Sequence, residues 1–86
     1  MPIPSTQLEQ ARSTVEAAAS VRAAAASLRA QFPGLHAIVV DAMDMRDETP
    51  TLSIGQRALF LAASDGHCWS VTADPARASA IILTEG

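Results

Sequence analysis

The feature that most constrains the fold is the stretch over residues 7–31, which contains no Gly or Pro and is rich in Ala. Ala has the highest intrinsic helix propensity, and Gly and Pro have the lowest. Thr6 and Glu9 have the spacing of a capping box, which predicts that a helix begins there. The run Phe32-Pro33-Gly34 predicts its end, because Pro disfavours helical backbone in the residue before it. The sequence therefore predicts one long N-terminal helix.

The predicted helix has two apolar stripes that point in different directions. At about 100° per residue, Leu8 and Val15 share one face, whereas Val21 and Leu28 share another. We infer that only the second half packs on the chain's own core. The first half is then expected to bend near Ser20 or to lie on another chain. A long, loosely packed Ala-rich helix is the alternative.

The rest of the chain predicts a sheet. Strands are expected over Leu35–Val40, Arg57–Ala63, His67–Thr72 and Ala80–Thr84, with a weak strand or turn over Leu52–Ile54 and a short helix over Pro75–Ser79. This order predicts one α+β domain over residues 1–86, in which the Ala-rich helix packs on an antiparallel sheet of about four strands. Residues 1–5 are expected to be a flexible arm, because Pro2 and Pro4 lack backbone donors.

The clearest local pattern is the hairpin around Ser64-Asp65-Gly66, since Asp-Gly favours a two-residue turn. Such a turn pairs Ala62 with Trp69 and places Phe60 on the same face. We expect this face to meet the helix, because it carries both large aromatic side chains of the hairpin. Trp69 is then predicted to be a buried residue of a thin core.

The opposite face of the predicted hairpin is too apolar for full exposure to water. It carries Leu59, Leu61 and Ala63. Together with the spare helical stripe of Leu8 and Val15, it predicts a face at which two copies of the chain meet. We therefore expect a homodimer.

Composition and charge exclude several classes of function. The formal net charge of −3 provides no electrostatic footprint for nucleic acid. The chain has no Lys, which excludes Schiff-base chemistry. Its single cysteine excludes an internal disulfide and favours a reducing cytoplasm. No apolar run approaches the ~20 residues of a membrane span, and the N-terminus lacks a signal-peptide pattern. We therefore expect a cytoplasmic protein.

No catalytic group stands out. His67 and Cys68 are neighbours on a predicted strand, so their side chains point to opposite faces and cannot act as a pair. Cys68 is expected to be a small buried apolar residue, and His67 a surface residue beside the turn. We predict that the protein is not an enzyme and carries no cofactor.

Two patterns between residues 36 and 48 are candidates for binding. Met43, Met45 and His36 have the ligand types of a Cu(I) site, but methionines at the frayed end of a strand are the commoner case, and we predict no metal. The acidic run of Asp41, Asp44, Asp47 and Glu48 is the only charge cluster, and it could attract a partner with a basic surface. An ordinary solvated loop is the alternative.

The second half of the chain resembles a small uncharacterised bacterial family. The resemblance covers residues 28–86 and is carried by Phe32-Pro33-Gly34-Leu35-His36, by the run from Asp65 to Thr72, by Asp74-Pro75 and by Ile81-Ile82-Leu83. It implies a proteobacterial origin and a gene often found among nitrogen-fixation genes, but no activity or catalytic residue.

Two functions remain open. The first is a non-catalytic accessory or protein-interaction module, associated through the resemblance with nitrogen fixation. The alternative is a small ligand- or metal-binding protein that uses the Met43, Met45 and His36 region together with the acidic loop.

Overall fold

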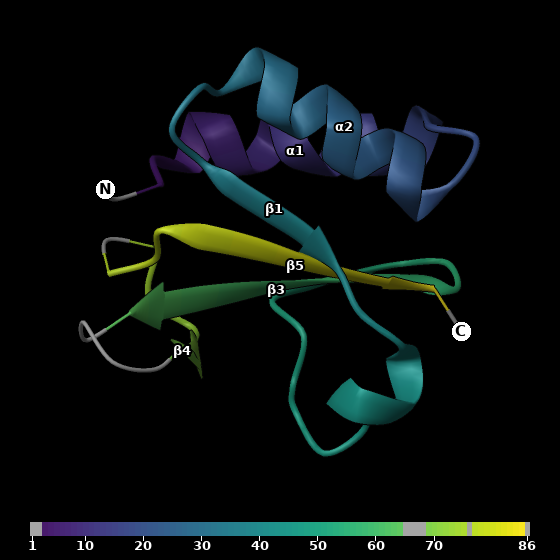
Figure 1. Ribbon diagram of the computed structural model, residues 1–86, viewed down its shortest axis with the longest axis vertical. Coiled ribbons are helices and arrows are strands. Elements are labelled where there is room, and N and C mark those ends of the chain that lie inside the picture. Colours follow the sequence, from purple (N-terminus) through teal and green to yellow (C-terminus); the bar gives the residue numbers. More distant parts are fainter. Residues whose placement is uncertain (1–2, 65–68, 76, 86) are drawn as a thin grey trace.

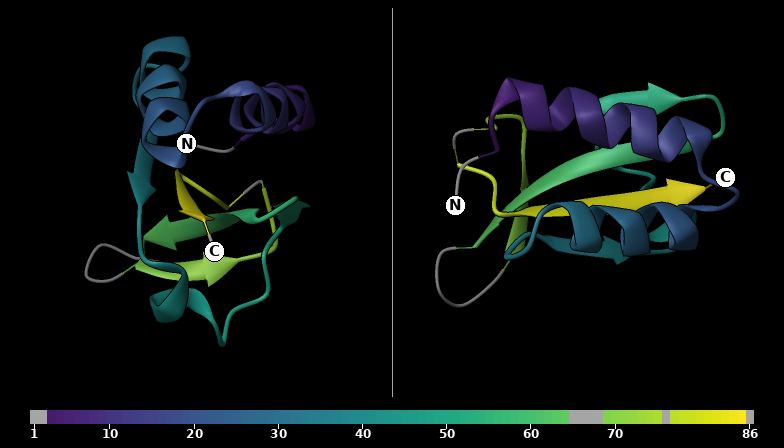
Figure 2. Two further views of the ribbon diagram at one scale, coloured as in Figure 1. Left: turned by 90° about the vertical axis from the view of Figure 1, so that its right-hand side faces the viewer. Right: turned by 90° about the horizontal axis from the view of Figure 1, so that it is seen from above.

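The structure, a computed structural model, describes residues 3–64, 69–75 and 77–85. In this part of the chain two helices lie on one side of a mixed five-stranded sheet, and a short 3-10 helix lies on the other side (Figures 1 and 2). The predicted α+β class, with the helical part ahead of the sheet, is confirmed. None of the helices in these residues combines the length and the apolar character needed to cross a bilayer.

The Ala-rich stretch forms two helices and not the single predicted one. Helix α1 spans Ser5–Ala17 and helix α2 spans Val21–Gln31. Between them, Ala18 and Ser20 have extended backbone, with ψ angles of 151° and 166°. The Ser20 hydroxyl accepts a hydrogen bond of 3.1 Å from the backbone N–H of Ala23, which caps the start of α2. The expected bend near Ser20 is thus a complete break.

The start of the chain differs from its prediction in two ways. Helix α1 begins at Ser5, with Pro4 as its N-cap, and no side-chain hydrogen bond caps it within the described residues, so the predicted capping box is wrong. The flexible arm is wrong for Ile3, whose side chain is only 3% exposed. The N–H of Ile3 donates a 2.8 Å bond to the carbonyl oxygen of Pro75. Burial of this apolar side chain holds the arm against the domain.

The sheet is mixed. Its strands are β1 (His36–Val39), β2 (Leu52–Ile54), β3 (Arg57–Ser64), β4 (Trp69–Thr72) and β5 (Ala80–Glu85). Strand β3 pairs antiparallel with β5 along one edge, and with β2 and β4 along the other. Strand β1 pairs with β5 in parallel, so the purely antiparallel sheet that was predicted is wrong at this edge. Parallel neighbours need a long connection, and residues 40–79 supply it.

The β3–β4 hairpin is paired differently from its prediction. Ser64 pairs with Trp69, and Ala62 pairs with Val71, so four residues separate the paired ends where two were expected. Side chains alternate with a period of two along a strand. The shift of two residues therefore leaves Trp69 on the same face as Ala62, as predicted.

Two short segments differ from their predicted conformations. The predicted helix over residues 75–79 is a turn in its described residues, where the N–H of Arg77 donates to the carbonyl oxygen of Asp74 at 3.1 Å. The expected loop after β1 instead contains the 3-10 helix η1 (Ala42–Met45). A carboxylate oxygen of Asp41 caps it, accepting a 3.0 Å bond from the N–H of Met43.

Two hydrophobic clusters pack on opposite faces of the sheet. The larger one lies between the helices and the sheet, and its largest fully buried side chains are Val15, Leu28, Leu59, Leu61, Ile81 and Leu83. The smaller one consists of Phe60, Ala62, Ala80 and Ile82, with Val40, Met45, Ala58 and Val71 packed against it. Because both faces of β3 are covered, its centre is buried on both sides.

The helices cover the face of the sheet opposite to the predicted one. Leu59, Leu61 and Val15 are 0% exposed, Leu8 packs against the same cluster, and Ala63 is half-buried. The prediction that these five residues form a dimer face is therefore wrong, because the chain's own helices occupy that face. Both faces of β3 are apolar in sequence, so alternation along the strand did not reveal which face the helices would cover.

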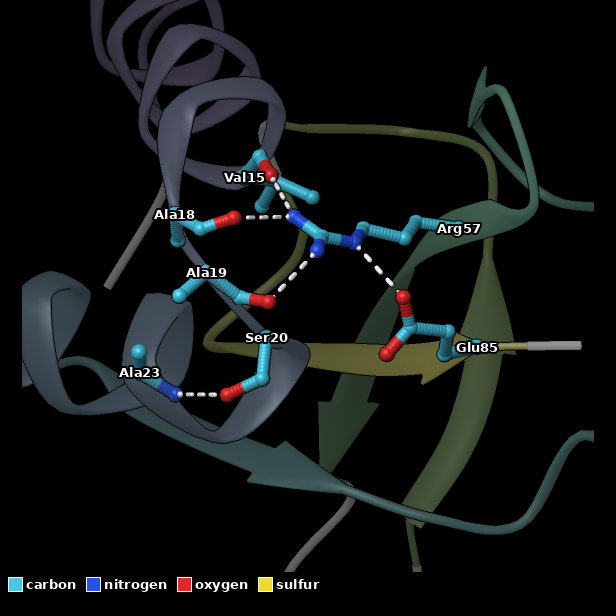
Figure 3. Close-up of polar contacts among 7 residues, drawn as sticks. All are labelled: Val15, Ala18, Ala19, Ser20, Ala23, Arg57 and Glu85. Atoms are coloured by element: carbon cyan, nitrogen blue, oxygen red, sulfur yellow. Dashed lines mark hydrogen bonds and ion pairs between the residues drawn. The ribbon is translucent and has the colours of Figure 1, made fainter.

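Arg57, the first residue of β3, forms hydrogen bonds with the backbone at the break between the helices (Figure 3). Its Nη1 donates to the carbonyl oxygens of Val15 and Ala18 at 2.6 and 2.7 Å, and its Nη2 donates to that of Ala19 at 3.1 Å. Its Nε donates to the Glu85 carboxylate at 3.0 Å. The last carbonyl groups of a helix lack helical partners. Arg57 satisfies these groups at the end of α1, a role the sequence did not reveal.

Candidate functional site

An apolar area on the sheet face away from the helices is left uncovered. Ile38 of β1 is 47% exposed and Trp69 of β4 is 51% exposed. The rings of His36 and Trp69 meet edge to face, with their centroids 5.7 Å apart. We call these three side chains, together with the depression between them, the open patch. It brings together the starts of β1 and β4, which are far apart in sequence.

The depression within the open patch has a volume of about 160 Å³. The depression is lined by His36, Ile38, Ala62, Trp69, Ala80 and Ile82. Ala62 and Ala80 pair across β3 and β5, and they are 1% and 3% exposed. Two neighbouring alanines form a low floor between the larger side chains of Ile38 and Trp69. The depression therefore follows from the small residues at this register.

The predicted burial of Trp69 is wrong. Trp69 pairs with Ser64 at the end of β3, on the face that the helices do not cover. Strand β4 pairs only with β3 among the described strands, so it lies at the edge of the sheet, and half of the indole remains in contact with water. Trp, Tyr and Arg are the residue types enriched among the residues that contribute most of the binding energy at protein interfaces.

The acidic run lies beside this face. We call residues 41–48 the acidic turn. Its acids Asp41, Asp44, Asp47 and Glu48 are all exposed, and Arg46 is its one basic residue. The turn contains η1, which lies on the side of the sheet away from α1 and α2 (Figure 2). Four exposed acids with one base give this side of the molecule a negative field.

The acidic turn borders the open patch. Met45 packs against the cluster that contains Ile82, and Ile82 also lines the depression. Asp41 follows Ile38 by three positions along the chain, which is about 10 Å of extended backbone. That distance is close to the Debye length of about 8 Å at physiological salt. Because salt screens most of the interaction at that distance, a ligand in the depression would meet the charge of the turn mainly through groups that extend toward it.

The structure does not assemble the Met43, Met45 and His36 group. His36 begins β1, whereas the methionines follow its end, and the strand between them spans about 10 Å. Met43 is 67% exposed, and Met45 is half-buried as a packing residue. In the described part of the chain, no group of three or more His, Cys, Asp or Glu could hold a metal ion. His67 and Cys68 lie outside the described residues.

One comparison with known proteins finds a match. A family of unknown function, DUF6129, matches residues 10–85. No curated protein and no solved structure matches the sequence. The matched range includes all five described strands, the open patch and the acidic turn.

Proposed function

We propose a function for this chain from the geometry of the open patch. The chain belongs to the DUF6129 family, and the function of that family is unknown. The protein is proposed to be a small, non-catalytic protein-interaction module. The observation that carries the proposal is the pair of half-exposed apolar side chains, Ile38 and Trp69, on the side of the sheet where the acidic turn lies. An apolar centre with a charged, solvated rim is the usual anatomy of a protein interface.

The acidic turn is proposed to steer the partner. Charges on the rim of an interface act mainly on the rate of association, and salt screens their effect. The backbone of the turn is fixed against the sheet at η1, because Met45 packs on the small cluster and Asp41 caps this helix. A negative rim of this kind favours a partner with a basic surface.

Small-ligand binding is the second candidate, and the depression favours it. Its volume of about 160 Å³ is similar to the roughly 150 Å³ of an engineered cavity that accepts benzene. The depression is open to water on one side and has the acidic turn beside it. We rank the protein interface first, because a small apolar ligand would not use those acids.

The process and compartment are also proposals. The resemblance of residues 28–86 to a bacterial family supports an accessory role in nitrogen fixation. The single cysteine supports a cytoplasmic location. Comparing the proteins that bind the chain in nitrogen-fixing cells and in cells supplied with ammonium tests the process. The same bound proteins at the same levels in both would contradict it.

Affinity capture with two matched variants tests the module itself. Ile38→Asp places a charge in the open patch, and Ala30→Asp places the same charge on an exposed position of α2. We expect the native chain and Ala30→Asp to retain the same partner and Ile38→Asp to lose it. Equal retention by both variants would contradict a module that works through this face.

A further inference from the structure

We propose that the open patch receives a protein segment that presents one Leu- or Phe-sized side chain flanked by arginines or lysines. This inference rests on the proposed interaction function and specifies the chemistry of the partner. The anchor residue enters the depression beside Trp69. The flanking cations lie over the acidic turn.

The size and the lining of the depression select the anchor. About 160 Å³ is room for a single benzene-sized group, so one large side chain fits and a row of them does not. The floor is formed by two apolar residues, and Ala62 is 1% exposed and Ala80 is 3% exposed before any partner binds. The wall is already arranged, because the His36 ring rests edge to face against Trp69. A preformed pocket with an aromatic wall lowers the ordering cost of binding.

The charges of the chain select the flanks. The acidic turn carries four exposed acids and one exposed base, Arg46, on the same side of the sheet as the depression. Lys and Arg flanks on a partner would pair with these acids while the anchor is desolvated. Acidic flanks in the same place would be repelled by these acids.

The positions of the three helix arginines argue against a second copy seated face to face. Arg12, Arg22 and Arg29 are exposed on α1 and α2, on the opposite side of the sheet from the acidic turn. Arg57 is already engaged by Glu85 and the end of α1. Two copies meeting through their open patches would bring the two acidic turns to one interface without those arginines. The net charge of −3 adds to this repulsion.

Fluorescence of Trp69 reports directly on the depression, because it is the only tryptophan of the chain. The probe is a synthetic Ala-based helical peptide without Trp or Tyr, with one central Phe flanked by arginines. Its twin carries glutamates in place of the arginines. We expect the arginine peptide to shift the emission to shorter wavelength in a saturable way and to protect it from acrylamide quenching. We expect the glutamate peptide to do neither.

Three variants make the assignment specific. Ala62→Leu fills the depression and is expected to weaken binding of the arginine peptide by about tenfold or more. Ala30→Leu adds the same atoms on an exposed position of α2 and is expected to bind as the native chain does. The triple change Asp44→Asn, Asp47→Asn and Glu48→Gln is expected to weaken binding and to flatten its salt dependence. Ile38→Ser, at an exposed wall, replaces Ala62→Leu if the latter does not fold.

Four results would overturn the proposal. The first is an unchanged Trp69 emission with the arginine peptide, and the second is equal binding of the two peptides. The third is native affinity in both Ala62→Leu and Ile38→Ser. The fourth is a concentration-dependent shift of the protein alone, with a doubled mass that Ala62→Leu abolishes, since the occupant is then a second copy. If the peptides fail while Ile38→Asp still loses a captured cellular partner, this inference fails and the interaction module stands.

Discussion

The guanidinium group of Arg57 donates a 2.7 Å hydrogen bond to the carbonyl oxygen of Ala18, 39 positions earlier in the chain. The bond joins the first residue of β3 to the C-terminal end of α1. The break between α1 and α2 leaves carbonyl groups without helical partners, and this side chain satisfies them. The two-helix arrangement therefore depends on a residue of the sheet.

We expect Arg57→Met to lower the free energy of unfolding by about 2–3 kcal/mol, because two partly buried carbonyl groups lose a charged donor. The Arg57 side chain is 16% exposed, so water replaces it poorly. Glu85→Gln is the matched control. The Glu85 side chain is 42% exposed, and its ion pair is expected to contribute less than about 1 kcal/mol. Urea denaturation followed by circular dichroism measures both, and equal losses would contradict the role given to the helix carbonyls.

Ser20→Ala removes the side-chain acceptor that caps α2. We expect a loss of about 1 kcal/mol in the free energy of unfolding. Ser27→Ala is the control, because Ser27 is exposed within the same helix and Ala is the better helix former there. The control is expected to be neutral or slightly stabilising. Thermal melts that move equally for both variants would show that the break does not depend on this cap.

Trp69→Ala is expected to lower stability by only about 1 kcal/mol, because half of the side chain already contacts water. Leu61→Ala, on the helix-covered face, is expected to lose about 2–5 kcal/mol, since Leu61 is 0% exposed. Urea denaturation of both is followed by far-ultraviolet circular dichroism, because the first variant removes the only tryptophan. A loss of stability for Trp69→Ala as large as that for Leu61→Ala would show that Trp69 is a core residue.

The homodimer stays a prediction, but it needs a surface other than the buried one first assigned to it. The outer edge of β1 is such a surface only when it is uncovered, because in the native chain the Nε of Arg29 covers it by donating to the carbonyl oxygen of Ala37 at 3.1 Å. A charged side chain over an edge strand opposes pairing with another chain. We expect Arg29→Ala to raise the mass measured by light scattering across a concentration series.

Arg22→Ala is the control for that experiment, because it removes the same charge from an exposed position of α2. Both changes make the net charge more negative and so oppose self-association by electrostatics. A mass increase specific to Arg29→Ala therefore points to the uncovered edge. The same mass for both variants at every concentration would rule out Arg29 as the residue that guards it.

Ile3→Ala is expected to lower the free energy of unfolding by about 2–4 kcal/mol, because the side chain is only 3% exposed in the main core. Thr6→Ala, at an exposed position of the same segment, is expected to change it by less than about 0.5 kcal/mol. Urea midpoints distinguish the two. A negligible effect of Ile3→Ala would support the predicted flexible arm. A loss of about 1 kcal/mol for Thr6→Ala would support the predicted capping box.

Much of the fold followed from local patterns in the chain. Ala-rich sequence without Gly or Pro predicts helix, and β-branched and apolar runs predict strands at the positions where β1, β3 and β5 lie. The acidic turn was also visible, because charge is a property of composition. The depression was not, since it needs Ala62 and Ala80, 18 positions apart, to be paired at the floor of one patch.

The sequence by itself determined the α+β class, the helical first third, the main strands and the negative charge around Asp44, because these depend on neighbours along the chain. Only the tertiary structure decided which face of β3 the helices cover, since both faces are apolar and the choice depends on packing among distant elements. That choice buried Leu61 and left Trp69 half-exposed. The tertiary structure also decided the helix break, because its carbonyl groups accept hydrogen bonds from Arg57, a residue distant in sequence.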